Sequence, residues 1–274
     1  MKIAAFMVVK DDEFYVDMAI KSVIDNCFVY VQDQCSTDGT YEKLLELQGR
    51  YLGKIAVEQA ETNLPKFDLK YNEPFFRSMA VERCERIFNP DWILKLDADE
   101  IYTEYFFRRL RENDLLIPEA ENERGEVYNG IRVAGDRFIS KTRRSVHPSS
   151  FEIAPDGTPF VDPHTQLWRS GLGIRYVKNP AFTHFHPVLD PDPRPQYWMP
   201  GVCNIHLHRL FGPKAKAFWA EGIDVMDPDK PLHPPTSCPN WYNSDINLGK
   251  SEEVDFTWPD YVLEKWASWE GGIF

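Results

Sequence analysis

Two aspartates separated by one residue follow a short apolar stretch near the middle of the chain. Residues 92–96 are apolar apart from Lys95, and Asp97-Ala-Asp99-Glu100 comes directly after them. In an extended chain, residues two apart point to the same side, so both carboxylates could face one ion. Carboxylate oxygens suit Mn²⁺ or Mg²⁺, and an ion held there could bind a diphosphate. The alternative is a charged loop with solvated carboxylates, but the apolar stretch before the pair favours a metal site.

Histidines form a second group with metal-binding potential. Six of the seven lie between residues 147 and 208, and four of these form two His-x-His pairs, His184 with His186 and His206 with His208. Each pair could place two imidazoles on one side of a strand. With carboxylates nearby, imidazoles ligate transition metals. A core histidine with satisfied hydrogen bonds is the alternative for each of them.

These polar groups follow segments that are expected to form a sheet. The continuous apolar run Ile3–Val9 is typical of a strand that is buried on both faces. Three further strands are predicted at residues 27–31, 54–58 and 92–96, and segments with helical spacing precede or separate them at residues 11–25, 40–47 and 72–88. This alternation predicts an α/β fold with a mainly parallel sheet and helices on both faces.

Ligands in such sheets bind beyond the carboxyl ends of the strands. The polar clusters at residues 10–13, 33–38 and 97–100 all fall at such ends. We therefore expect three separate segments to meet in one cleft.

The pattern changes after Leu115. Short strand-like segments joined by turns follow, and the final third is rich in proline and tryptophan. Runs such as Asp190–Pro195 cannot lie inside a helix or a central strand. We expect one domain over residues 1–210 and a C-terminal extension, residues 211–274, packed on it.

Composition limits the classes of function. The 274 residues carry a net charge of −12, which disfavours a wide nucleic-acid-binding face. The five cysteines are odd in number and none has C-x-x-C spacing, so reduced thiols and a cytoplasmic location are expected. The chain shows neither a signal-peptide pattern nor an apolar run of about 18 residues, so no membrane span is expected.

Four segments, in order, resemble family 2 glycosyltransferases with the GT-A fold. Met7–Glu13 (MVVKDDE) resembles the family's opening strand and the polar residues after it, and Val31–Thr40 (VQDQCSTDGT) its V-x-D-x-x-S-x-D-G-T segment. Phe76–Ser78 lies where the family often has Ala-Arg-Asn, and Leu96–Glu100 (LDADE) resembles its D-x-D-E. The resemblance is good over residues 3–105, loose over residues 106–186 and faint beyond.

The resemblance implies a nucleotide-diphospho-sugar transferase fold and roles for matching residues. Asp33 would contact the base or ribose, and the alternative, which we favour less, is an aspartate that stabilises a turn. Lys10 and Glu13 would line the nucleotide pocket, or else serve as capping or surface residues. Arg77 would face the donor together with Asp97, or instead pair with a carboxylate at the sheet end.

The resemblance also implies a late histidine ligand for the metal. Relatives often carry His-Glu where this chain has Thr183-His184-Phe-His186, so His184 is the first choice and His186 the second, beside Asp97 and Asp99. Without the ion, we expect the neighbouring carboxylates to repel one another.

An inverting transferase needs a carboxylate that takes the proton from the acceptor hydroxyl. The family usually supplies it after the D-x-D segment, where Asp162 and Asp136 are the candidates. Lys214 and Lys216 lie in a segment that could close over a diphosphate, but a solvated basic loop is the favoured interpretation.

The expected activity is thus metal-dependent, inverting transfer of a hexose-like sugar from a nucleotide-diphosphate donor to an acceptor hydroxyl. UDP is the expected nucleotide because it is the commonest in the family. The acceptor stays open among a glycan, a lipid-linked sugar, a protein and a modified nucleobase. The alternatives are a nucleotidyltransferase, although residues 10–13 lack the glycines of its phosphate loop, and a non-catalytic module that binds nucleotide sugars or glycans.

Overall fold

The structure is a computed structural model of the chain. It describes residues 1–60, 72–117, 120–136, 141, 143–145, 151–153, 159–161, 163–178, 188–208, 210–216 and 251–269. Within these residues the chain forms an α/β fold around one eight-stranded sheet in the order β3-β2-β1-β4-β10-β6-β13-β5. The strands are β1 (Ile3–Val9), β2 (Phe28–Asp33), β3 (Ile55–Gln59), β4 (Trp92–Lys95), β5 (Glu100–Tyr102), β6 (Gly130–Asp136), β10 (Pro163–Arg169) and β13 (Gln196–His206).

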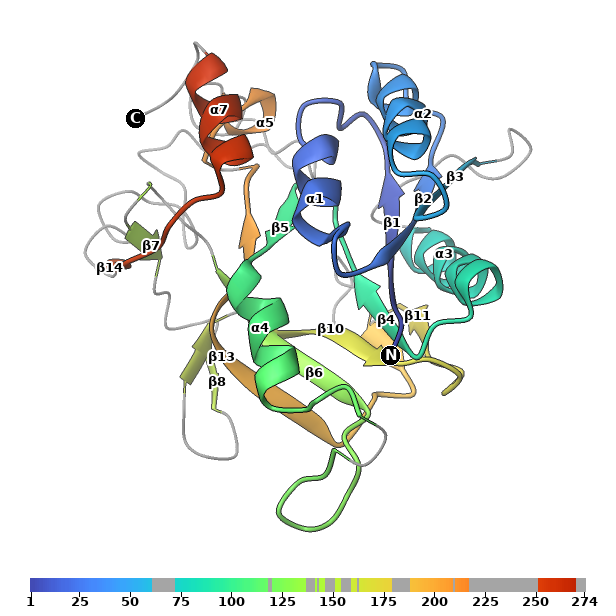
Figure 1. Cartoon of the computed structure of the whole chain (residues 1–274), viewed down its shortest axis with the longest axis vertical. Coiled ribbons are helices and arrows are strands. Elements are labelled where there is room, and N and C mark those ends of the chain that lie inside the picture. The colour runs from blue at the N-terminus through green and yellow to red at the C-terminus, as the bar shows by residue number, and fades with distance from the viewer. Residues whose placement is uncertain are drawn as a thin grey trace.

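Helices and three small sheets surround this large sheet (Figure 1). The helices are α1 (Val16–Val23), α2 (Thr40–Arg50), α3 (Glu73–Phe88), α4 (Glu104–Glu112), α5 (Pro213–Lys216) and α7 (Asp260–Ser268). The small sheets in the described part of the chain pair β11 (Arg175–Val177) with β12 (Val188–Asp190), β7 (Arg143–Ser145) with β14 (Ser251–Glu253), and β8 (Phe151–Ile153) with β9 (Pro159–Val161).

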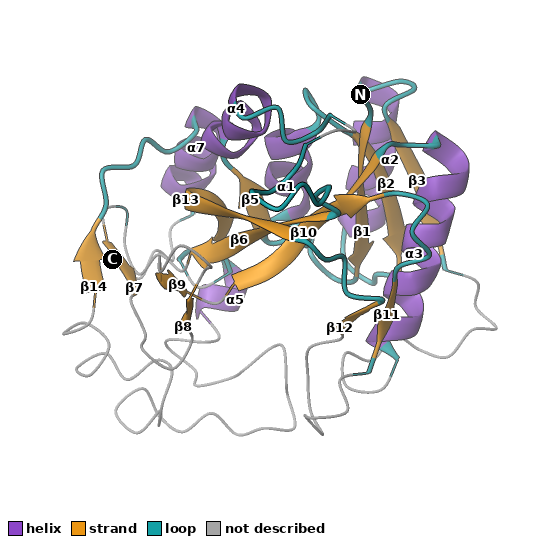
Figure 2. Ribbon diagram, turned by 90° about the horizontal axis from the view of Figure 1, so that it is seen from below, coloured by secondary structure: helices purple, strands orange, loops and turns teal. Residues whose placement is uncertain are grey.

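Strands β1 to β4 form the parallel half of the sheet, as predicted. Alternate residues of β1 point to opposite faces. Ala5 and Met7 pack in a core that includes residues of α1, α2 and α4, whereas Ala4 and Phe6 pack against α3 and β11. Figure 2 shows α1 and α3 on different sides of β1. The prediction of an α/β fold with helices on both faces of the sheet is confirmed.

The other half of the sheet is mixed, and this sets the direction of β13. Strand β10 is antiparallel to both β4 and β6, so β6 runs in the same direction as β1 and β4. Strand β13 is parallel to β6, and β5 is antiparallel to β13. The last residues of β13 therefore lie at the same end of the sheet as the last residues of β1, β2 and β4. We call this end the carboxyl end of the sheet.

The described parts of the C-terminal region pack beside α1 and β13. Phe211, Trp258 and Trp266 share a buried cluster with Tyr15 and Ile205. The ring of Phe211 stacks on that of Trp266 with centroids 4.7 Å apart, and the hydroxyl of Tyr15 donates to the Phe211 carbonyl at 2.8 Å. This packing fixes the chain just after β13.

Two other features bear on the sequence-based expectations. None of the helices in the described residues has the length and apolar character needed to cross a membrane. Cys27, Cys35, Cys84 and Cys203 are free thiols.

Candidate functional site

Strands β1, β2, β4 and β13 each end in polar residues at the carboxyl end of the sheet. Asp12 follows β1, Asp33 ends β2, and residues 97–99 follow β4. His206 ends β13, and the backbone N–H of Leu207 donates to the Asp99 carbonyl at 2.7 Å. The segments that were predicted to converge do so, and β13 adds one that was not predicted.

A tight turn separates the partners of the two aspartates. The backbone N–H of Glu100 donates to the carbonyl of Asp97 at 3.1 Å, which closes the turn before β5. Asp97 contacts cations on one side of this turn, and Asp99 faces β13 on the other. Only Asp99 belongs to the possible metal-ligand group found among the described residues.

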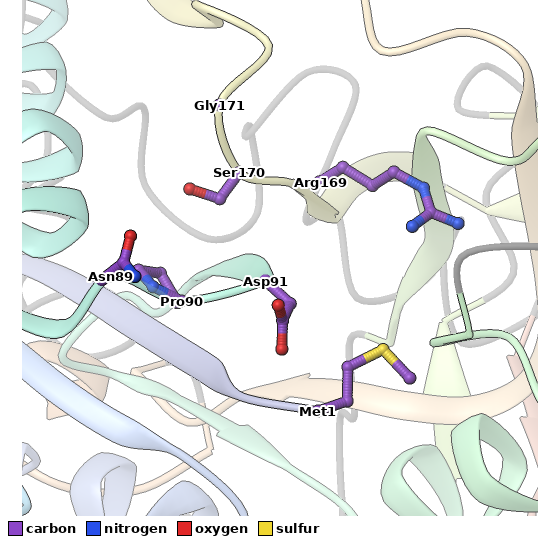
Figure 3. A pocket seen from close by; sticks show the side chains of 7 residues that line it. All are labelled: Met1, Asn89, Pro90, Asp91, Arg169, Ser170 and Gly171. Atoms are coloured by element: carbon purple, nitrogen blue, oxygen red, sulfur yellow. The ribbon is translucent and has the colours of Figure 1, made fainter.

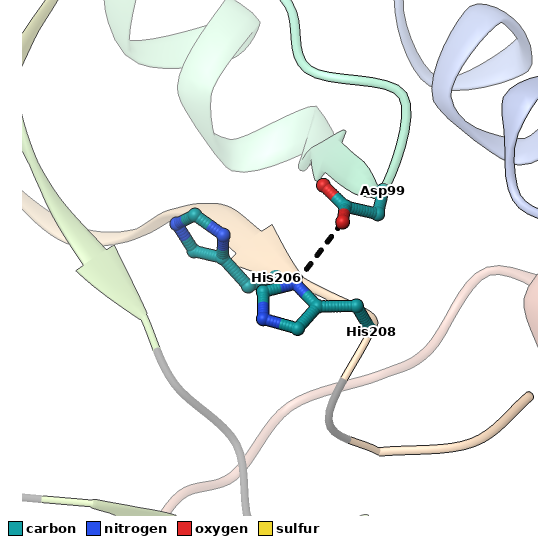
Figure 4. Close-up of side chains that lie close together, drawn as sticks. All are labelled: Asp99, His206 and His208. Atoms are coloured by element: carbon teal, nitrogen blue, oxygen red, sulfur yellow. Dashed lines mark ion pairs between the residues drawn. The ribbon is translucent and has the colours of Figure 1, made fainter. Parts of the chain in front are cut away.

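That group consists of Asp99, His206 and His208. One ligand atom from each lies within 4.8 Å of the others, and Nδ1 of His208 is 3.2 Å from Oδ2 of Asp99. The two histidines are two residues apart at the end of β13, and Figure 4 shows both rings near the Asp99 carboxylate. Nε2 of His206 also lies 3.2 Å from Oε1 of Glu100, which is fully buried. Two imidazoles and a carboxylate could hold a divalent transition metal.

Lys214 reaches the same carboxylate from α5. Its Nζ lies 3.1 Å from Oδ2 of Asp99 and also contacts Oδ1 of Asp12. The side chain of Lys214 is only 17% exposed, so the interpretation of a solvated basic loop is wrong for this residue. The side chain of Lys216 lies outside the described residues.

The pKa values of these groups reflect burial and opposite charge. Burial acts to raise the pKa of Asp99, but Lys214 and His208 outweigh it and hold that pKa well below its ordinary value. The pKa of Asp12 rises to about 7, because burial and the nearby Asp99 exceed the opposing effect of Lys214. Burial acts to lower the pKa of Lys214, but Asp99 and Asp12 raise it overall. Asp99 and Lys214 are therefore both charged at neutral pH.

Asp97 is held by two cations. Its Oδ1 lies 2.7 Å from Nη1 of Arg77, and its Oδ2 lies 2.6 Å from Nζ of Lys95. Arg77 also pairs with Glu73 through Nε at 2.6 Å, and Lys95 lies 3.3 Å from Glu100. Burial acts to raise the pKa of Asp97, but the two cations lower it overall. Arg77 thus makes the contact with a sheet-end carboxylate that was the alternative to a donor-facing role.

One carboxylate oxygen of Asp33 contacts a turn, and the other is a buried acceptor without a hydrogen bond among the described residues. Its side chain is fully buried, and Oδ2 accepts the backbone N–H of Ser36 at 3.1 Å and Nε2 of Gln59 at 3.0 Å. Its Oδ1 is buried and accepts no hydrogen bond from any residue that the structure describes. Because an unpaired buried acceptor is costly, this oxygen is suited to a ligand donor.

Lys10 and Glu13 differ in their surroundings. Lys10 is half-buried directly after β1, whereas Glu13 is exposed beside the start of α2. The backbone N–H of Glu13 donates to Asp38 at 3.1 Å, and a Cβ on Gly39 would come within 2.5 Å of the Glu13 carboxyl carbon. The Glu13 backbone therefore connects the loop after β1 to the start of α2 through Asp38, while its side chain lies at the surface.

Of the other four predicted site residues, the structure describes only the backbone of Asp136. Asp136 ends β6 at the carboxyl end of the sheet, where its backbone lies opposite Ile205 of β13. Asp162, His184 and His186 lie outside the described residues, so their predicted roles stay predictions.

A pocket of about 570 Å³ lies at the other end of the sheet. Its lining includes Met1 before β1, residues 89–91 before β4, and residues 169–171 at the end of the antiparallel β10 (Figure 3). One Asp91 oxygen already accepts the backbone N–H of Lys2 at 2.6 Å. Since it lies at the amino ends of β1 and β4, this pocket is separate from the candidate site.

Neither a protein-family model nor a curated protein matches the sequence. The structure is similar to S. aureus TarS residues 1–349, with 15% identity, a TM-score of 0.47, and 76% of this chain and 61% of that one covered. For the mannosyltransferase PcManGT from Pyrobaculum calidifontis, in complex with GDP-Man and Mn²⁺, the values are 14% identity, a TM-score of 0.33, and 50% and 36% coverage.

A putative glucose-1-phosphate thymidylyltransferase from Bacillus anthracis is similar as well, with 9% identity, a TM-score of 0.36, and 62% of this chain and 73% of that one covered. This chain spans less than two thirds of the TarS fragment and of PcManGT. The α/β fold with its mixed, mostly parallel sheet resembles GT-A transferase structures. Since all three TM-scores are below 0.5, function has to be argued from the geometry of the site.

Proposed function

We propose that this protein is a metal-dependent glycosyltransferase that moves a sugar from a nucleoside-diphosphate donor to an acceptor hydroxyl. The observation that carries the proposal is the meeting of Asp99, His206 and His208 at the carboxyl end of the sheet. Ligands of open α/β sheets bind at this end. A metal there would lie where the diphosphate of a donor is expected.

The three candidate ligands, Asp99, His206 and His208, suit a divalent ion, and the local charge favours one as well. Five carboxylates, those of Asp12, Glu73, Asp97, Asp99 and Glu100, face three cations, Arg77, Lys95 and Lys214. Asp12 has a pKa of about 7 and burial raises the pKa of Glu100, so a bound cation would favour the charged forms of these excess acidic groups. Asp99, His206 and His208 would hold it, and the ion would stabilise the negative charge of the leaving diphosphate.

The nucleotide would bind beside β2. Oδ1 of Asp33 is a buried acceptor without a hydrogen bond among the described residues, and it can accept an N–H of a base or a ribose hydroxyl. Lys10 directly follows the neighbouring strand β1 and supplies a cation near the same place. A uridine nucleotide is our choice from the family resemblance, and a guanosine nucleotide is the first alternative to test.

Arg77 and Asp97 would line the donor site as a fixed pair. Arg77 bridges Glu73 and Asp97, so it holds the Asp97 carboxylate in place from α3. Lys95 holds the second oxygen of the same carboxylate. We propose that Asp97 contacts the donor from this fixed position and that Asp99 serves the metal.

The proton of the acceptor hydroxyl needs a base. Asp136 and Asp162 remain our candidates, and the position of the Asp136 backbone beside β13 supports the first. A base there would leave inversion of the anomeric centre as the expected outcome.

Free thiols at four cysteines are in keeping with a proposed cytoplasmic location.

The test is a donor screen that measures released nucleotide. Slow hydrolysis of the donor needs no acceptor, so purified protein can be incubated with UDP-sugars and GDP-sugars, with Mn²⁺ or with a chelator. We expect UDP or GDP release from at least one donor, dependent on the metal. Release of pyrophosphate from a nucleoside triphosphate and a sugar phosphate, with no release of nucleotide from any donor, would instead indicate a nucleotidyltransferase.

A further inference from the structure

We propose that Lys214 acts as a resident cation of the metal site and competes with the divalent ion for Asp99. In the metal-free protein the lysine ammonium neutralises Asp99. The arriving ion has to displace it, and the donor diphosphate then offers it a new anionic partner. The competition with the ion rests on geometry alone, whereas the diphosphate step rests on the proposed function.

Lys214 and a bound metal ion would compete for the same oxygen of Asp99. Oδ2 of Asp99 lies 3.1 Å from Nζ of Lys214 and 3.2 Å from Nδ1 of His208. An ion bound by Asp99 and His208 would occupy the space next to this oxygen. The ammonium and a doubly charged ion would then repel each other across a few ångströms in a buried site.

The backbone that carries Lys214 is held firmly, so the side chain has to make the adjustment. The hydroxyl of Tyr15 donates to the Phe211 carbonyl at 2.8 Å, and the Phe211 ring stacks on Trp266. Gly212 has a φ of 96°, and a Cβ there would come within 2.5 Å of the Tyr15 hydroxyl. A lysine side chain has four rotatable carbon bonds and can swing while this backbone stays in place.

Asp12 gives the displaced ammonium a partner. Nζ of Lys214 already contacts Oδ1 of Asp12, and the backbone N–H of Asp12 is fixed by the Thr40 hydroxyl at 2.8 Å. The lysine can therefore leave Asp99 and remain paired. A donor diphosphate bound to the ion would bring further negative charge within its reach.

This arrangement predicts linkage between metal and donor. If the diphosphate draws Lys214 away from Asp99, the donor tightens metal binding, and the metal must tighten donor binding by the same factor. A lysine that only buttresses Asp99 predicts the reverse for metal binding, since its loss would leave a misplaced carboxylate. Competition and simple support of Asp99 therefore predict opposite changes in Mn²⁺ affinity when Lys214 is replaced.

The experiment titrates Mn²⁺ into the full chain without nucleotide and follows free Mn²⁺ by electron paramagnetic resonance. Lys214→Met removes the charge and keeps a flexible, unbranched side chain of similar size, and Lys214→Gln replaces the ammonium with a neutral hydrogen-bond donor. Because one nearby charge shifts an ionic equilibrium by roughly ten- to thousand-fold, we expect Mn²⁺ to bind at least about tenfold more tightly to either variant. Lys21→Met is the matched control, because its ion pair with Asp17 on α1 is unrelated to the site, and it should bind like wild type.

Unchanged or weaker Mn²⁺ binding in a variant that folds like wild type would overturn the proposal. Repeating the titration with UDP present separates it from the proposed function. UDP should tighten Mn²⁺ binding more in wild type than in Lys214→Met, and an equal gain in both proteins would contradict the diphosphate step. If UDP and GDP have no effect on wild type, the proposed function fails, while the titration without nucleotide still decides the competition.

Discussion

At the scale of single residues, the two aspartates of the D-x-D segment have different partners. Asp97 is neutralised by Arg77 and Lys95, whereas Asp99 contacts Lys214 and faces His206 and His208. The turn that begins at Asp97 separates them. Asp99 is therefore the residue whose charge the metal needs, and Asp97 is a fixed carboxylate beside it.

Asp99→Asn tests this division of roles. The variant should lose most Mn²⁺ affinity, because an amide is a weaker ligand than a carboxylate. It should also be less stable without metal, by about 1–3 kcal/mol, since the buried Lys214 would lose one of its two partners. The crowding of acidic residues in the sequence predicts relief of repulsion instead, but the structure places cations beside them. Urea unfolding in the presence of a chelator measures the change.

Near wild-type Mn²⁺ affinity in Asp99→Asn would contradict the metal assignment. Equal or greater stability without metal would show that repulsion exceeds the ion pair. Asp17→Asn is a suitable control, since it removes a largely buried carboxylate on α1 that pairs with Lys21 and Lys265, outside the candidate site.

The two histidines predict a choice of metal. Imidazole favours Mn²⁺, Co²⁺ and Zn²⁺ over Mg²⁺, which prefers oxygen ligands. We therefore expect calorimetric titration to show Mn²⁺ binding at concentrations at which Mg²⁺ does not bind. His208→Asp should reduce the difference between Mn²⁺ and Mg²⁺ affinity, because it replaces a nitrogen ligand with an oxygen ligand. Tight Mg²⁺ binding by wild type, or no effect of His208→Asp on the preference, would show that the histidines are not ligands.

Part of this site could be predicted from the sequence. Asp33 and Asp99 stand at the ends of apolar strands, so their place follows from local pattern and strand direction. The partners of Asp99 could not be predicted from the local sequence pattern. His206 and His208 reach it only because β13 is parallel to β6, a relation between segments far apart in sequence. Family position favoured His184 and His186 instead, and Lys214 lies in a segment without a strong pattern.

At the scale of elements, the loop after β1 and the start of α2 hold each other. Asp38 accepts the backbone N–H groups of Thr40 at 2.9 Å and Glu13 at 3.1 Å. Burial acts to raise the pKa of Asp38, but these hydrogen bonds and one from the Thr40 hydroxyl lower it overall. Because Asp12 lies in this loop, the contacts also position one partner of Lys214.

Asp38→Asn should reveal this contribution through its pH dependence. A carboxylate with a lowered pKa in the folded state stabilises the fold above its unfolded value, about 3.9, and loses that effect as pH falls through the folded pKa. We expect the variant to be less stable by about 1 kcal/mol at pH 6, in the range of helix-capping contacts. The difference should vanish below the folded pKa. Urea unfolding at a series of pH values measures it, and a difference that persists unchanged at low pH would contradict the assignment.

Element prediction succeeded where one segment carries its own signals. Helix α3 begins after Asn72 with proline in its first turn and ends at Asn89, whose φ of 43° is left-handed. Strand β13 lacks such signals, because Pro200 and Gly201 interrupt it and its register against β6 shifts between Met199 and Asn204. The first turn expected for α1 is instead the loop that presents Asp12.

At the scale of the whole molecule, distant parts of the chain complete the site. The first four strands supply Asp12, Asp33 and Asp99, whereas the histidines and Lys214 come from residues more than 100 positions later. Helix α7, near the C-terminus, packs against the segment between them through Trp266. The described C-terminal residues are thus part of what holds the site.

Trp266→Ala should therefore affect stability strongly. The side chain is buried, stacks on Phe211 and meets Trp258 edge to face with centroids 5.7 Å apart. Truncation of a buried tryptophan costs about 3–5 kcal/mol. Glu264→Ala on an exposed position of the same helix should stay within about 0.5 kcal/mol of wild type. Equal effects of the two changes, measured by urea unfolding, would show that α7 does not support the fold.

The proposed function depends on a metal at Asp99, His206 and His208 that binds the diphosphate of a nucleotide. Calorimetric titration of UDP and GDP into wild-type protein, with Mn²⁺ and then with a chelator, tests it most directly. We expect at least one nucleotide to bind with Mn²⁺, and we expect this binding to be lost with the chelator and in His208→Ala. Failure of both nucleotides to bind with Mn²⁺ present, or binding that is the same with the chelator, would contradict a metal-bound diphosphate at this site.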